Sequence, residues 1–221
     1  MSKEEFKGID RVGYNIDGVE SVSAYIPKSE FTPKEGQILD AENIRLGGRY
    51  LRHDRNGRLQ QITVVKTPFN EGGRTWMVAM TEMPPKYGSY VSKTSLADSG
   101  VLPYENNRMN SDNYLTLDES AVPDRKGEIE KKIDEHNLRE AAVLVLAGAV
   151  EAEDPSKRLA YLKTFAMLLD RAKLKLEHFD LNMTDIIAIA NVAYQQQDGS
   201  RPMAQAIHEM ASDALSAFPQ E

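Results

Sequence analysis

The sequence predicts an α+β protein in which a small antiparallel β-domain precedes an all-α helical bundle. Two observations predict it. Residues 41–95 hold four short runs rich in β-branched and aromatic residues, and glycine-bearing turns separate them. From residue 126 onward, apolar residues recur at helical spacing between recognisable caps. We therefore expect a β-rich domain over residues 1–95, a linker over 96–125 and a helical bundle over 126–221.

The first predicted strand covers residues 19–26. Its apolar residues Val22, Ala24 and Ile26 alternate with more polar ones, which is the period of a half-buried strand. We expect this strand to add to the sheet of the next segment.

A hairpin follows, with Asn56-Gly57 as its predicted two-residue loop, because both residues tolerate positive φ. That loop would place Arg55 opposite Arg58, His53 opposite Gln60, Leu51 opposite Ile62 and Arg49 opposite Val64. One face would then carry Leu51, Ile62 and Val64 near its base and His53, Arg55 and Arg58 at its tip.

The meander continues through predicted strands at residues 59–66, 75–81 and 87–91. Its predicted core is Tyr50, Ile62, Val64, Trp76 and Val78. Short strands of this kind close economically into a small barrel, since closure removes exposed edges. The spacing resembles that of SH3-like and Tudor-like small barrels, and the resemblance implies binding of peptides or nucleic acid through exposed aromatic rings. An open sheet covered by helices would give the same pattern.

Residues 96–125 are rich in Asp, Asn, Gly and Pro, which is why we interpret them as a linker. Helices are predicted over residues 127–136, 138–152, 155–178 and 185–197, with a last one opening near Ser200 and Pro202. Residues 141–150 are apolar all round, which is typical of a helix at the centre of a bundle. Asp154-Pro155 is a cap followed by proline at the first helical position.

Composition narrows the function classes. The chain has no cysteine, which excludes disulfides, thiolate metal ligands and a cysteine nucleophile. No apolar run approaches the roughly 20 residues of a membrane helix, and no signal peptide is recognisable, so we expect no membrane contact and a cytoplasmic location. A virion or other assembly loaded from the cytosol fits as well.

Signatures of catalysis are missing. The four histidines, His53, His136, His178 and His208, are far apart, and none has the spacing of a metal site. The glycine pairs lack the lysine of a phosphate loop, and the paired carboxylates fall on predicted helix ends. We expect no enzyme, no cofactor, no metal site and no catalytic residue.

Charge provides the functional hypothesis. Residues 41–95 hold nine Lys and Arg against four Asp and Glu, a net charge of +5, whereas the whole chain has a net charge of -7. Cations beside aromatic rings are what single-strand binders use. The candidate ligand-binding residues are Arg49, Arg52, His53, Arg55, Arg58, Lys66, Arg74, Trp76, Tyr87 and Tyr90. They favour a non-enzymatic binding protein whose partner is nucleic acid or an acidic protein.

Two alternatives stay open at this point. The basic face could instead dock on the acidic helices of the same chain or of a neighbouring copy, which would make the protein a structural or assembly component and a homo-oligomer. Met77, Met80 and Met83, beside Trp76, could form a docking patch, although core packing is the better interpretation of such residues.

Overall fold

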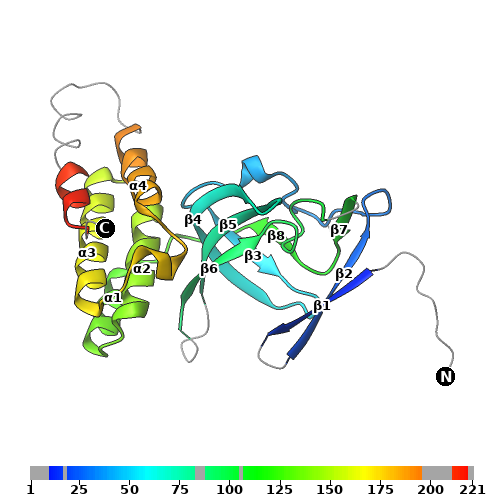
Figure 1. Cartoon of the computed structure of the whole chain (residues 1–221), viewed down its shortest axis with the longest axis horizontal. Helices are drawn as coiled ribbons and strands as arrows, with labels where there is room; N and C mark the ends of the chain where they lie inside the picture. The colour runs from blue at the N-terminus through cyan, green and yellow to red at the C-terminus, as the bar shows by residue number, and fades with distance from the viewer. Residues whose placement is uncertain (1–9, 17–18, 83–87, 105–106, 196–210, 219–221) are drawn as a thin grey trace.

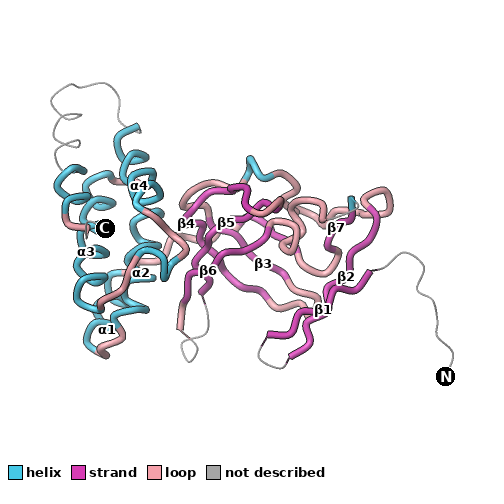
Figure 2. The backbone as a smooth tube through the Cα atoms, viewed as in Figure 1, coloured by secondary structure: helices cyan, strands magenta, loops and turns pink. Residues whose placement is uncertain are grey.

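The computed structural model describes residues 10–16, 19–82, 88–104, 107–195 and 211–218, and shows an α+β protein with two antiparallel sheets. Helices gather at one end of the molecule and strands make up the rest (Figures 1 and 2). The strands are β1 (Asp10–Ile16), β2 (Val19–Pro27), β3 (Arg49–His53), β4 (Leu59–Glu71), β5 (Arg74–Glu82), β6 (Tyr90–Ser95), β7 (Arg108–Asn110) and β8 (Tyr114–Leu117).

The larger sheet has the strand order β6-β5-β4-β3-β8. The predicted meander is present as β3 to β6, each strand antiparallel to the next. Strands β6 and β8 form its two edges and do not pair with each other in the described part of the chain. The sheet is therefore open, and the closed barrel expected from strand length is not formed.

The β3–β4 register differs from the predicted one by one residue. His53 pairs with Leu59, Leu51 with Gln61 and Arg49 with Thr63. Because side chains alternate faces along a strand, a one-residue shift moves each partner to the other face. Tyr50 and Arg52 therefore share a face with Gln60 and Ile62, whereas His53 shares the opposite face with Leu59 and Gln61.

Asp54 is the physical reason for this shift. Its carboxylate accepts hydrogen bonds from the backbone N–H groups of Asn56 at 2.7 Å and Arg58 at 2.9 Å. The Asp54 N–H donates to the Arg58 carbonyl, which leaves a three-residue loop ending at Gly57, whose φ is 72°. A turn of this length with glycine in the left-handed region is the second common hairpin type.

The two-residue glycine turn occurs instead between β4 and β5. Glu71 pairs with Arg74, so the loop is Gly72-Gly73, and both glycines have positive φ, at 58° and 76°. Residues that carry a side chain rarely adopt positive φ, which explains why glycine occupies both positions.

Strand β2 confirms the strand predicted over residues 19–26, but its sheet differs from the prediction. It pairs with β1 and β7 in a separate three-stranded sheet. Strands β7 and β8 both come from residues 96–125, the expected linker. That segment thus contributes one strand to each sheet.

The helices are α1 (Lys126–Asp134), α2 (Leu138–Glu151), α3 (Pro155–Ala172) and α4 (Met183–Gln195), and the 3-10 turns are Ala41–Asn43 and Leu176–Phe179. Residues 211–216 are also helical. The predicted cap of α3 is confirmed, since Asp154 accepts from the Ser156 N–H. Helix α3 ends at Ala172 rather than at the predicted residue 178, because Lys173 adopts a left-handed conformation with φ of 53°. At the start of α4, the Asn182 N–H donates to Asp185 Oδ2 and the Asp185 N–H donates to Asn182 Oδ1. The predicted helix start near Ser200 lies outside the described residues.

The sheet is buried on both faces. Val65, Val78 and Met80 join the cluster formed by the helices, in which residues 141–150 of α2 are all buried. On the other face, Tyr50, Ile62, Val64, Met77 and Leu115 belong to a second cluster.

The predicted core is mostly confirmed. Tyr50, Ile62, Val64 and Val78 are buried, whereas Trp76 is only half-buried. Met77 and Met80 are fully buried and do not form a docking patch, and Met83 lies outside the described residues. None of the helices in the described ranges is long and apolar enough to cross a membrane.

Candidate binding surfaces

Arg49 lies inside the molecule. Its side chain is 8% exposed and forms an ion pair with Asp118, with 3.0 Å between Nη2 and Oδ2. Its Nη1 also donates to the carbonyls of Ser120 and Ala121, both at 2.9 Å. These contacts hold the segment after β8 against the sheet.

The candidate residues Lys66 and Arg74 also have partners inside the chain, as does Lys93 of β6. Lys66 Nζ lies 3.0 Å from Asp185 Oδ2, an ion pair that joins β4 to α4. Lys93 pairs with Glu71 and lies over the ring of Trp76, 4.8 Å from its centroid. Arg74 donates to Tyr104 Oη at 2.6 Å. The basic middle segment is thus partly neutralised by acidic residues of the same molecule.

Three arginines lie at the end of the β3–β4 hairpin. Arg55 and Arg58 are exposed, and Arg52 is half-buried. Arg52 and Arg58 form no ion pair with a residue in the described part of the chain. The carboxylate of Asp54, in the same turn, accepts from the backbone N–H groups of Asn56 and Arg58. We call Arg52, Arg55 and Arg58 the arginine tip.

His53 occupies the opposite face of the same hairpin. Its ring stacks on Tyr114 with 4.2 Å between centroids and 9° between planes, and its Nε2 lies 2.9 Å from Thr116 Oγ1. Burial lowers the pKa of His53, so the ring is neutral near pH 7. His53 therefore contributes an aromatic surface rather than a positive charge.

The remaining aromatic candidates lie elsewhere. Tyr90 is 43% exposed and belongs to β6, the far edge of the sheet. Trp76 Nε1 donates to the Glu71 carbonyl beside the glycine turn, and Tyr87 lies outside the described residues. The structure therefore spreads the nine predicted residues that it describes over several places rather than one.

A buried charge cluster joins the sheet to the helices, and sequence reasoning did not find it. Arg125 donates from Nε to Glu151 Oε2 at 2.6 Å, and from Nη2 to Glu151 Oε1 at 2.7 Å and Glu82 Oε1 at 2.6 Å. Thr63 Oγ1 donates to Glu151 at 2.8 Å. Arg125 and Glu151 side chains are both 2% exposed.

Opposing effects set the pKa of Arg125 in this cluster and the pKa of Asp118, the partner of Arg49. Burial alone would lower the pKa of Arg125, but hydrogen bonds and charges from Glu151 and Glu82 outweigh it and raise that pKa. Burial would raise the pKa of Asp118, whereas hydrogen bonds from Ser120, the charge of Arg49 and a bond from Gln61 lower it overall. Arg125 and Asp118 are therefore both charged at neutral pH.

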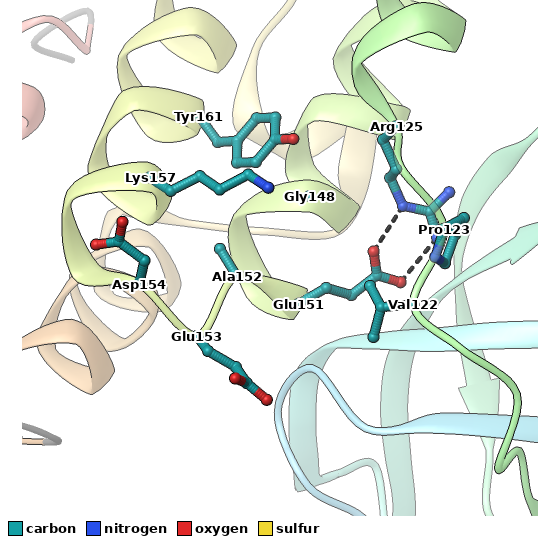
Figure 3. Close-up of a pocket in the computed structure, with 10 residues that line it drawn as sticks. All are labelled: Val122, Pro123, Arg125, Gly148, Glu151, Ala152, Glu153, Asp154, Lys157 and Tyr161. Carbon is teal, nitrogen blue, oxygen red and sulfur yellow. Dashed lines mark hydrogen bonds and ion pairs between the residues drawn. The ribbon is translucent and has the colours of Figure 1, made fainter.

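A cavity of about 380 Å³ opens beside this cluster, between the end of α2, the start of α3 and the segment before α1 (Figure 3). Its lining comprises Val122, Pro123, Arg125, Gly148, Glu151, Ala152, Glu153, Asp154, Lys157 and Tyr161. Within the described ranges, no group of three or more His, Asp or Glu side chains is arranged to hold a metal ion.

Comparison of the chain with protein-family models, with curated proteins and with solved structures finds no match. Any function is therefore argued from the geometry of these surfaces.

Proposed function

We propose that the protein is a non-enzymatic binding protein that engages an acidic partner, either nucleic acid or an acidic protein surface, through the arginine tip. The observation that supports this is the position of Arg52, Arg55 and Arg58 around a single turn, with Arg55 and Arg58 exposed. Two of the other candidate cations, Arg49 and Lys66, are less accessible, because each forms an ion pair with an acidic residue of the chain at side-chain exposures of 8% and 19%.

An exposed turn that carries several guanidinium groups can form electrostatic contacts with an acidic partner. Guanidinium groups bind phosphate and carboxylate in a bidentate manner, and each phosphate they neutralise releases a counterion. The partner's affinity should therefore fall steeply as salt rises. The aromatic pair of His53 and Tyr114 lies on the other face of the hairpin, so charge rather than ring stacking is the main source of affinity.

The test replaces all three arginines with glutamine and titrates a single-stranded oligonucleotide and polyglutamate at several salt concentrations. The triple variant should bind whichever polyanion the natural chain binds, but more weakly. For the oligonucleotide, the slope of log binding constant against log salt concentration should shrink by about 2, at roughly 0.7 per phosphate contact. A matched control replaces Lys126, Lys131 and Lys173, which are 71% to 82% exposed and lie at the helical end. Equal losses in both variants, or no binding of either polyanion by the natural chain, would refute the proposal.

An assembly role is the second candidate, and the β1–β2 hairpin favours it. Strand β1 pairs only with β2 in the described residues, so its outer edge offers unpaired backbone groups to another strand. The hairpin lies at the end of the molecule opposite the helices (Figure 1).

Sedimentation over a wide concentration range tests this role. Self-association should rise with concentration, and Val12→Lys should reduce it, because a lysine on an edge strand opposes edge-to-edge pairing. A chain that stays monomeric at the highest concentration removes self-assembly.

A further inference from the structure

The cavity beside the buried charge cluster is lined by two polar side chains from α3, those of Lys157, which is exposed, and Tyr161, which is half-buried. Lys157 and Tyr161 lie one turn apart on α3 and extend across Gly148 of α2 (Figure 3). Neither side chain forms a hydrogen bond or ion pair with any residue in the described part of the chain. Both present donors to the open space.

Gly148 is required for this arrangement. A Cβ at that position would lie 2.9 Å from Cζ of Tyr161, closer than real Cβ atoms come to neighbouring atoms. The glycine lets the phenol ring lie against α2. The Tyr161 hydroxyl then faces the cavity.

The acidic residues of the lining are already engaged or face elsewhere. Both carboxylate oxygens of Glu151 accept from Arg125. Asp154 accepts from the Ser156 N–H as the cap of α3. The side chain of Glu153 extends away from Lys157 and Tyr161 (Figure 3). Of the two cations that line the cavity, Arg125 pairs with Glu151, whereas the ammonium of Lys157 has no carboxylate partner in the described part of the chain.

We propose that this cavity binds a small anion bearing a carboxylate or phosphate group, held by Lys157 Nζ and Tyr161 Oη. The ammonium supplies the charge and the phenol a directed hydrogen bond, which is how proteins fix an acidic group. Val122 and Pro123 form the opposite wall, against which the apolar part of a larger carboxylate packs. Glu151 keeps Arg125 engaged, so the ligand does not disturb the buried cluster.

The experiment titrates the full chain with inorganic phosphate and, separately, with succinate, while chloride holds the ionic strength constant. Amide chemical shifts of residues 148, 152–154, 157 and 161 should move and saturate. Lys157→Gln should weaken binding at least about tenfold, since a hydrogen bond to a charged group is lost, and Tyr161→Phe should weaken it less. Binding of phosphate alone or of succinate alone identifies the group that the site selects.

Lys126→Gln is the matched control, because Lys126 is an exposed lysine of α1, 77% exposed, that does not line the cavity. The affinity of the Lys126→Gln variant for phosphate and for succinate should equal that of the natural chain. Shifts that never saturate with either anion overturn the proposal. Saturating shifts that persist unchanged in both cavity variants overturn it as well, because the anion would then be held elsewhere.

Discussion

At the scale of single residues, the buried charges decide which cations are available. Arg49 counted as a candidate ligand residue because the sequence places it in the basic segment. The structure surrounds it with Asp118, Ser120 and Ala121. Removing one partner of such a buried pair is costly, because the other charge is left without compensation. Arg49 therefore has a stabilising role inside the molecule.

Asp118 makes this role measurable. Its pKa lies below the ordinary value in the folded chain, so its stabilising effect is fully present above the unfolded-state pKa of about 4 and is lost as pH falls through the folded-state value. Asp118→Asn should lower the free energy of unfolding by about 2 kcal/mol near pH 7, since charge-assisted hydrogen bonds are removed.

Chemical denaturation from pH 7 down to acid conditions checks this prediction. The difference between the natural chain and Asp118→Asn should narrow as pH falls. Asp134→Asn is the control, because Asp134 is exposed at the end of α1 and its side chain has no partner in the described structure. A difference that stays constant with pH would mean that Asp118 is not a charged partner of Arg49.

At the scale of elements, local signals in the sequence were sufficient for the longer strands and helices. Alternation and turn glycines predicted β3, β4 and β5, and the Asp154-Pro155 cap predicted the start of α3. The all-apolar run predicted a fully buried α2. Each of these depends on residues a few positions apart.

The features that the sequence did not predict have two causes. The β3–β4 register depends on a competing local signal, because the carboxylate of Asp54 accepts from two turn amides and opposes the two-residue Asn-Gly loop. The other features depend on contacts between residues that are far apart in the chain. Strands β7 and β8 are three and four residues long, too short for a periodic pattern, and form because distant strands pair with them. Thr63 and Glu151 of the buried cluster are 88 residues apart in the chain. From the sequence alone, Glu151 was therefore interpreted as a solvent-exposed residue at the end of a helix.

At the scale of the whole molecule, the sheet and the helices share one hydrophobic cluster. Val65, Val78 and Met80 belong to the same buried cluster as residues of α2 and α3. The ion pairs Arg125–Glu82 and Lys66–Asp185 cross the same boundary. Separating the two parts would expose apolar surface and break these ion pairs. Both effects favour a single cooperative unit over two independently folding parts.

Trp76, the only tryptophan of the chain, lies in β5, so its fluorescence reports on the sheet, while far-ultraviolet circular dichroism reports mainly on the helices. Unfolding curves from the two signals should coincide. Glu151→Gln should shift both curves by the same amount, because Glu151 of α2 accepts a hydrogen bond from Thr63 of β4 and so belongs to a contact between the two parts. Glu177→Gln should shift neither curve, because Glu177 is exposed on the 3-10 turn before α4. Two separate transitions, with only one of them sensitive to Glu151→Gln, would show that residues 1–95 and 126–221 fold as the independent domains predicted from the sequence.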